Sequence, residues 1–87
     1  AYRDSLGWAL FRLERYKEAL VELQSAAGAE DPDAVILDHL GDTYHQLDQP
    51  QKARDAWQQA VKAFHKEGED EKAAKVEKKI TSSEQEK

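Results

Sequence analysis

Apolar side chains recur along the chain with the spacing of amphipathic helices. In each of four stretches they stand three or four positions apart, which places them on one face of an α-helix. The stripes comprise Leu6, Leu10 and Leu13; Ala19, Leu20, Leu23, Ala26 and Ala27; Leu37, Leu40, Tyr44 and Leu47; and Ala53, Trp57, Ala60, Val61 and Phe64. The pattern predicts helices near residues 2–13, 17–28, 34–47 and 50–66.

Capping and turn residues separate these stripes. Asp31 followed by Pro32 suits a helix N-cap and first helical position, and Pro50 opens the next helix in a similar way. Gly28 suits the C-terminal end of a helix. The predicted helices therefore form two pairs, and a short turn joins the members of each pair.

A more polar fifth helix follows. Residues 68–70 make a turn and cap, and residues 71–80 are mostly charged. Their narrow apolar strip consists of Ala73, Val76 and Ile80, with help from Ala74. A polar end helix of this kind suits the role of covering the last hairpin of a stack. Residues 81–87 are polar and lack periodicity, so they are predicted to be disordered.

The two helix pairs share a period. The shift that brings Gly7 onto Gly41 also brings Leu6 onto Leu40 and Ala19 onto Ala53. A glycine inside a helix costs about 1 kcal/mol relative to alanine. That cost is acceptable where two helices must approach closely, so each glycine is predicted to lie against the second helix of its pair. A period of this length, about 34 residues, is typical of one kind of helix-turn-helix repeat.

Residues at matching places in the two helix pairs resemble the motif of a known repeat family. The first helices carry Leu6, Gly7 and Leu10, then Leu40, Gly41 and Tyr44; the second helices carry Ala19, Leu23 and Ala26, then Ala53, Trp57 and Ala60. Over roughly residues 1–65 the chain thus resembles the tetratricopeptide repeat family, in particular C-terminal repeats of large bacterial members. At the position of the family's first Trp, the two repeats carry Arg3 and Leu37. The family's closing Pro comes one position late in the first repeat, at Pro32, and is His65 in the second.

The resemblance implies an all-α fold, in which two antiparallel helix-turn-helix repeats stack as a short right-handed superhelix with a C-terminal capping helix. The repeats would span residues 1–33 and 34–67, the capping helix 68–80 and the tail 81–87. Lys75 stands where a third repeat would carry its glycine, so the stack is expected to end there.

The resemblance also implies a concave groove, lined by the first helices, that binds a protein or peptide segment. The matching positions here are Asp4, Trp8, Phe11, Arg12, Val35, Asp38, Asp42 and His45. Aromatic and acidic side chains together favour a partner with apolar anchors and Lys or Arg. The acidic residues would repel a chaperone's C-terminal carboxylate, so that known ligand of the family is not expected.

Two alternatives stay open. Trp8 and Phe11 equally suit packing against a neighbouring first helix or a preceding repeat. The whole segment also suits a purely structural role as the terminal repeats of a longer superhelix, with self-association through its N-terminal face. Trp57 stands at the family's large-residue position, so it is predicted to be core.

Composition narrows the chemistry further. The net charge of −5 argues against nucleic acid, and the sequence contains no long apolar run for a membrane span. The absence of cysteine excludes disulfides and thiolate metal sites and suits cytosol and periplasm equally. Asp38, Asp42 and His45 share a face, but their spacing matches no metal motif, and a solvated surface is the favoured interpretation. No catalytic set is recognisable, so neither enzyme activity nor a cofactor is expected.

Overall fold

The chain folds into helices throughout the part that the structure describes. The computed structural model describes residues 2–28 and 33–85, with side chains from Leu6 to Gly28 and from Asp33 to Ser83. The described helices are α1 (Tyr2–Arg12), α2 (Tyr16–Ala27), α3 (Ala34–Gln46), α4 (Pro50–Lys66) and α5 (Asp70–Gln85). These residues contain no strand, so the predicted all-α class is confirmed. In the described residues, no helix is long and apolar enough to cross a bilayer.

The helices begin and end at the capping and turn residues of the sequence, with one difference from the prediction. Pro50 opens α4, and Gly28 follows the last residue of α2, as predicted. The N-cap of α3 is Asp33, whose carboxylate accepts a hydrogen bond from the backbone nitrogen of Val35 at 3.3 Å. The predicted cap at Asp31 and Pro32 lies outside the described residues.

The prediction of a disordered tail is wrong for residues 81–85. Helix α5 continues to Gln85, well beyond the predicted end at residue 80. The buried strip of α5 extends past Ile80 to Ser83, whose side chain is only 5% exposed. Since a small serine can pack where an apolar residue is expected, hydropathy alone does not show how far the strip continues. Residues 86 and 87 lie outside the described part.

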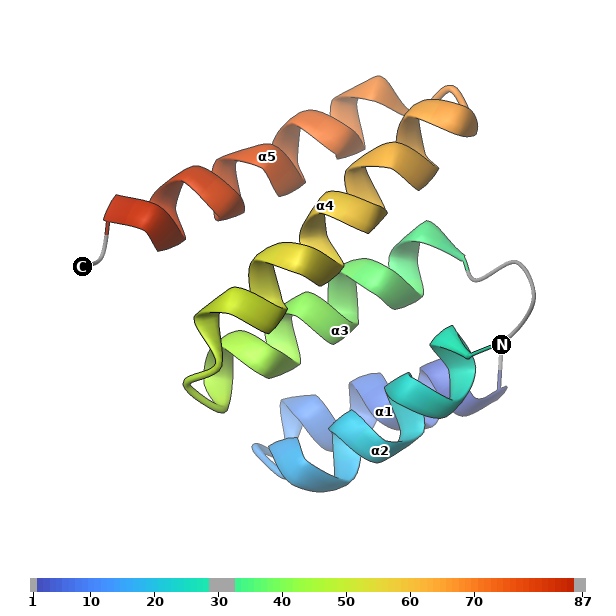
Figure 1. The fold of residues 1–87 in the computed structure, drawn as a ribbon. Coiled ribbons are helices and arrows are strands. Elements are labelled where there is room, and N and C mark those ends of the chain that lie inside the picture. Colours follow the sequence, from blue (N-terminus) through green and yellow to red (C-terminus); the bar gives the residue numbers. More distant parts are fainter. Residues whose placement is uncertain (1, 29–32, 86–87) are drawn as a thin grey trace.

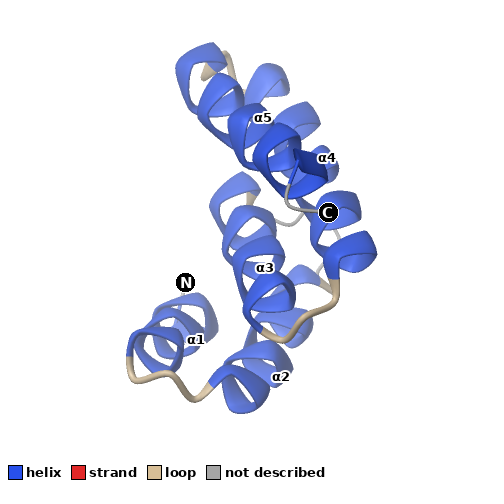
Figure 2. Cartoon of the chain, turned by 90° about the vertical axis from the view of Figure 1, so that its left-hand side faces the viewer, coloured by secondary structure: helices blue, strands red, loops and turns tan. Residues whose placement is uncertain are grey.

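Consecutive helices pack against one another in chain order, from α1 to α5 (Figure 1). In addition, α1 touches α3. Seen from the side, α1 and α3 lie on one side of the molecule, while α2 and α4 lie on the other (Figure 2). Side chains of α1 and α3 can therefore share one face, although they are distant in sequence.

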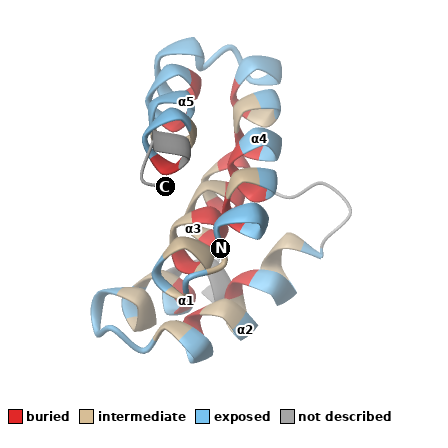
Figure 3. Ribbon diagram, turned by 60° about the vertical axis from the view of Figure 1, so that its left-hand side comes forward, coloured by how far each residue is buried: buried red, intermediate tan, exposed pale blue. Residues whose placement is uncertain are grey.

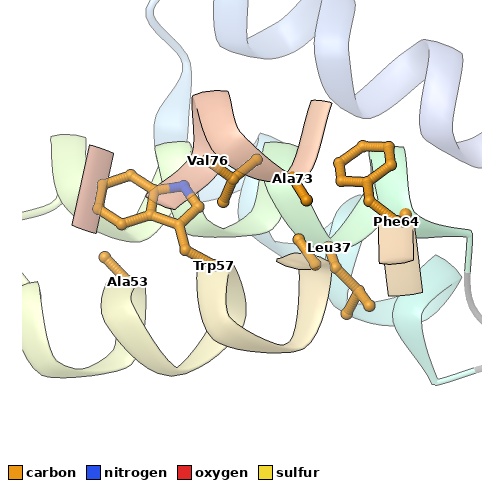
Figure 4. Packing of buried hydrophobic residues seen from close by; sticks show 8 residues of the cluster. Leu37, Ala53, Trp57, Phe64, Ala73 and Val76 are labelled. Carbon is orange, nitrogen blue, oxygen red and sulfur yellow. The ribbon is translucent and has the colours of Figure 1, made fainter. Parts of the chain in front are cut away.

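The main core lies between α3, α4 and α5, where buried residues line the facing sides of these helices (Figure 3). Trp57 and Phe64 of α4 pack with Leu37 of α3 and Val76 of α5 (Figure 4). Trp57 is thus a core residue, as predicted. A smaller cluster joins α2 to α3 and α4 through Leu23, Leu40 and Ala56.

The two mid-helix glycines are buried at close contacts between helices, as predicted. A Cβ atom on Gly7 would lie 2.8 Å from Leu23 Cγ of α2. A Cβ atom on Gly41 would lie 2.8 Å from Trp57 Cγ of α4 and nearer still to Cδ1. Because carbon atoms that are not bonded to each other do not approach so closely, both positions exclude any side chain in the present packing.

The leucine stripe of α1 is formed but largely uncovered. Leu6 is 38% exposed and Leu13 is 66% exposed. Helix α2 packs on the Gly7 side of α1, and the leucines occupy a different side of the same helix. An apolar stripe of this kind is expected to face a partner helix. Among the described helices none covers Leu6 and Leu13, while Leu10 between them is half-buried.

Candidate functional site

A stack of aromatic rings joins α1 to α3. The ring of Trp8 lies parallel to that of Phe11, with centroids 4.7 Å apart, and parallel to that of His39, with centroids 3.9 Å apart. The rings of Tyr16 of α2 and Phe11 form a T-shaped pair with centroids 5.1 Å apart. All four side chains are half-buried, so the stack holds α1 against α3 and still presents ring surface to solvent.

This geometry favours one of the two interpretations of Trp8 and Phe11. The two residues are three positions apart, so they rise on the same side of α1. That side faces α3, where His39 supplies the third ring. Packing against the neighbouring helix is therefore observed for Trp8, and any binding role has to use the ring surface that remains exposed.

An ion-pair cluster joins α3, α4 and α5. The ammonium of Lys79 lies 2.8 Å from Asp38 Oδ1, and 3.1 and 3.2 Å from the two carboxylate oxygens of Asp42. The indole nitrogen of Trp57 donates a hydrogen bond to Asp42 Oδ1 at 3.2 Å. Both carboxylates are mostly buried. The acidic pair expected to attract a basic partner already holds a cation from the same chain.

Burial and neighbouring charge set the protonation of this cluster. Burial raises the pKa of Asp42, and the nearby Asp38 carboxylate adds to that rise, while Lys79 only partly offsets it. Burial by itself would lower the pKa of Lys79, but its bonds to Asp38 and Asp42 outweigh this effect, so the Lys79 pKa is raised. Lys79 therefore stays cationic and forms ion pairs with both carboxylates.

A hollow of about 350 Å³ lies beside this cluster, between α3, α4 and α5. Its walls include Asp42, His45 and Trp57 on one side and Lys79 and Ser83 on the other. The His45 ring lies 5.7 Å from the Trp57 ring. The hollow is therefore lined by an aromatic surface and by several polar side chains.

The predicted site residues fall into two groups and three outliers. The aromatic stack contains Trp8 and Phe11, and the ion-pair cluster with its hollow contains Asp38, Asp42 and His45. Val35 packs against the main core rather than lining an open groove. Arg12 is exposed at the end of α1. Asp4 belongs to α1, but its side chain lies outside the described residues.

Sequence reasoning missed two residues of the site, His39 and Lys79. Lys79 belongs to the mostly charged part of the predicted fifth helix, yet its ammonium is bonded to α3. The signal was its position one helical turn after Val76, on the buried strip of α5. For His39 the sequence carries no comparable signal, because its stacking depends on how α1 and α3 meet.

The carboxylates of α3 hold an ammonium, and in the described residues no group of three acidic or histidine side chains has the geometry to hold a metal ion. Comparison of the chain with protein-family models, with curated proteins and with solved structures gave no match.

Proposed function

We propose that the chain consists of two tetratricopeptide-type repeats with a capping helix, and that this module binds a polypeptide segment along the face shared by α1, α3 and α5. The observation that supports it best is the equivalence of the α1–α2 and α3–α4 hairpins under the shift that carries Gly7 onto Gly41. Two features of the hairpins support this equivalence.

The first feature is the turn between the helices of each hairpin. Glu14 and Asp48, which are separated by the same interval as Gly7 and Gly41, both adopt the left-handed conformation with φ of 60°. The next residue donates a backbone hydrogen bond to the same relative carbonyl in each case: Arg15 to Leu10 at 2.9 Å and Gln49 to Tyr44 at 3.0 Å. Left-handed residues other than glycine are uncommon, so their recurrence at this period is informative.

The second feature is the close contact inside each hairpin. Gly7 lies against Leu23, and Gly41 lies against Trp57. The interval along the chain between the glycine and its large partner is the same in both cases. Two hairpins with the same turn and the same internal contact are what a repeat of this family would produce.

The binding face offers aromatic surface in one part and charge in another. The Trp8–Phe11–His39 stack suits an apolar or aromatic side chain of a partner, because such rings provide rigid contact area. The Asp38–Asp42 pair suits Lys or Arg, but a partner cation has to displace Lys79. We therefore expect apolar contacts at the stack to contribute most of the affinity, while basic residues contribute only as far as they compete with Lys79.

The test is a titration of the ¹⁵N-labelled chain with a library of peptides that combine aromatic and basic residues. Binding along this face should shift amide signals of α1 and α3 and the indole signals of Trp8 and Trp57. For a peptide that binds, Trp8→Ala should weaken affinity roughly tenfold, as expected for loss of an aromatic anchor. Val21→Ala, on the exposed outer side of α2, is the matched control and should leave affinity unchanged.

A second pair of variants tests the charge part separately. Lys79→Met removes the internal cation and should strengthen binding of the basic peptides. Lys62→Met changes the net charge equally at an exposed position of α4 that does not line the hollow, and it should leave binding unchanged. If no peptide perturbs residues 2–46 in any of these chains, the groove proposal fails.

A purely structural role as the terminal repeats of a longer stack is the second candidate. The exposed Leu6 and Leu13 favour it, because large apolar residues left uncovered on one helix face are typical of a contact surface. Removing this segment from a longer parent protein should then lower the stability of the parent without removing a discrete binding activity.

A further inference from the structure

The apolar stripe of α1 has a covered counterpart within the same molecule. The repeat period carries Leu6, Leu10 and Leu13 onto Leu40, Tyr44 and Leu47 of the second hairpin. Leu6 is 38% exposed, whereas Leu40 is only 8% exposed. The same type of residue, at the same place in an equivalent helix, is thus buried in one hairpin and exposed in the other.

The two leucines differ in burial because α2 packs over Leu40, whereas no described helix packs over Leu6. Leu40 packs with Leu23 of α2, and Leu20 and Ala27 of α2 pack against the same cluster. Tyr44 joins this contact, and its hydroxyl accepts a hydrogen bond from the side-chain amide of Gln24 at 2.9 Å. Helix α2 therefore covers the stripe of α3, and among the described helices none stands in the equivalent place on α1.

We infer that the Leu6–Leu10–Leu13 face docks the second helix of a further helical hairpin of the α1–α2 kind, placed one unit before α1 in the same polypeptide. The occupant would carry apolar residues at the places of Leu20, Leu23 and Ala27. This contact is separate from the groove face, since the leucines and Trp8 lie on different sides of α1. It deepens the structural candidate and does not depend on partner binding.

One difference between the stripes of α1 and α3 predicts which residue the docking helix carries at the place of Gln24. Where α3 has Tyr44, α1 has Leu10, which provides no hydrogen-bond acceptor. A glutamine at the place of Gln24 would lose its partner there, so an apolar residue at that place fits the α1 face better than glutamine does.

The experiment extends the chain by a second copy of its own first hairpin. Residues 1–34 are placed directly before residue 1, so that equivalent glycines keep the interval from Gly7 to Gly41. The extended chain should unfold in a single transition, with Tm raised by at least about 5 °C, and the amides of the original α1 should exchange more slowly with solvent. Gln24→Leu in the added copy should raise Tm further.

The matched control carries Leu20→Lys in the added copy, which affects the docking side of that helix and leaves its Gly7–Leu23 contact intact. Leu6→Lys in the original copy tests the other side of the same contact. Each should return Tm to that of the chain without the added copy. An added hairpin that melts separately, or leaves Tm unchanged, overturns the inference. So does a dimer of the original chain that Leu6→Lys dissociates, because the occupant would then be a second copy.

Discussion

At the scale of single residues, two glycines determine how closely the helices of each hairpin approach. Gly41 faces the rigid indole of Trp57, whereas Gly7 faces the branched end of Leu23. A leucine can change rotamer to relieve a clash, but an indole that also donates a hydrogen bond to Asp42 has less freedom. The same substitution should therefore have unequal effects at the two equivalent positions.

Gly41→Ala should lower the free energy of unfolding by about 2 kcal/mol, because overpacking against Trp57 outweighs the gain of about 1 kcal/mol in helix propensity. Gly7→Ala should cost less than Gly41→Ala. Gly28→Ala is the control: its added Cβ would meet only ordinary contacts from 3.4 Å, and its φ of −74° suits alanine. Urea unfolding checks all three, and equal losses at Gly41 and Gly28 would contradict the packing argument.

Lys79 links the stability of the fold to alkaline pH. Its folded pKa is raised above the usual 10.5, so its contribution is complete below pH 10.5 and is lost as the pH rises through the folded value. Asp42 also makes the fold less stable as the pH rises, but in the acidic range. Because its folded pKa is raised above 3.8, its ionisation opposes folding as the pH rises from 3.8 through the folded value.

The stability difference between the parent chain and Lys79→Met should therefore stay constant from neutral pH to 10.5 and shrink above that value. Denaturant unfolding at a series of pH values measures this difference. Comparison with Lys79→Met cancels the titration of the other lysines and the tyrosines. A difference that persists unchanged at the highest pH would show that the Lys79 charge contributes no stability.

At the scale of elements, α5 is held by a small set of contacts with α4 and α3. Its apolar contact with α4 is made chiefly by Ala73 and Val76, with Ile80 partly buried beside them. Its polar link to α3 is made by Lys79. A charged helix of this composition needs such tertiary contacts, because surface ion pairs within it contribute less than about 1 kcal/mol each.

Lys79→Met should lower the free energy of unfolding by about 1–2 kcal/mol, between the values typical of exposed and of buried ion pairs. The loss arises because Asp38 and Asp42 remain mostly buried without their cation. Lys78→Met, at an exposed position, should change stability by less than about 0.5 kcal/mol. Adding Asp38→Asn to Lys79→Met should restore part of the loss, and an unaltered double variant would argue against this explanation.

At the scale of the whole molecule, the two hairpins share a turn conformation and a glycine contact but have different surroundings. The α3–α4 hairpin has α2 on one side and α5 on the other, so its helices form most of the core. Among the described helices, the α1–α2 hairpin has a neighbour on one side only. The exposure of Leu6 and Leu13 follows directly from this asymmetry.

Equivalent substitutions should therefore have unequal costs. Leu40→Lys places a charge in the contact between α2 and α3 and should cost about 3 kcal/mol or more. Leu6→Lys, at the equivalent but exposed position, should cost less than about 1 kcal/mol in the chain as it stands. Thermal and urea unfolding of the two variants measure the difference. Similar losses would mean that Leu6 contributes to packing as much as Leu40 does.

The sequence by itself determined the positions of the five helices except the C-terminal end of α5, the turns before Pro50 and at Gly68, and the two glycines where helices meet closely. These features are local or recur at a fixed period, so spacing and residue type are sufficient to predict them. The aromatic stack on His39 and the binding of Lys79 to Asp38 and Asp42 were decided only by the tertiary structure. They depend on which helices become neighbours and how those helices are rotated about their axes, and no single helix pattern contains that information.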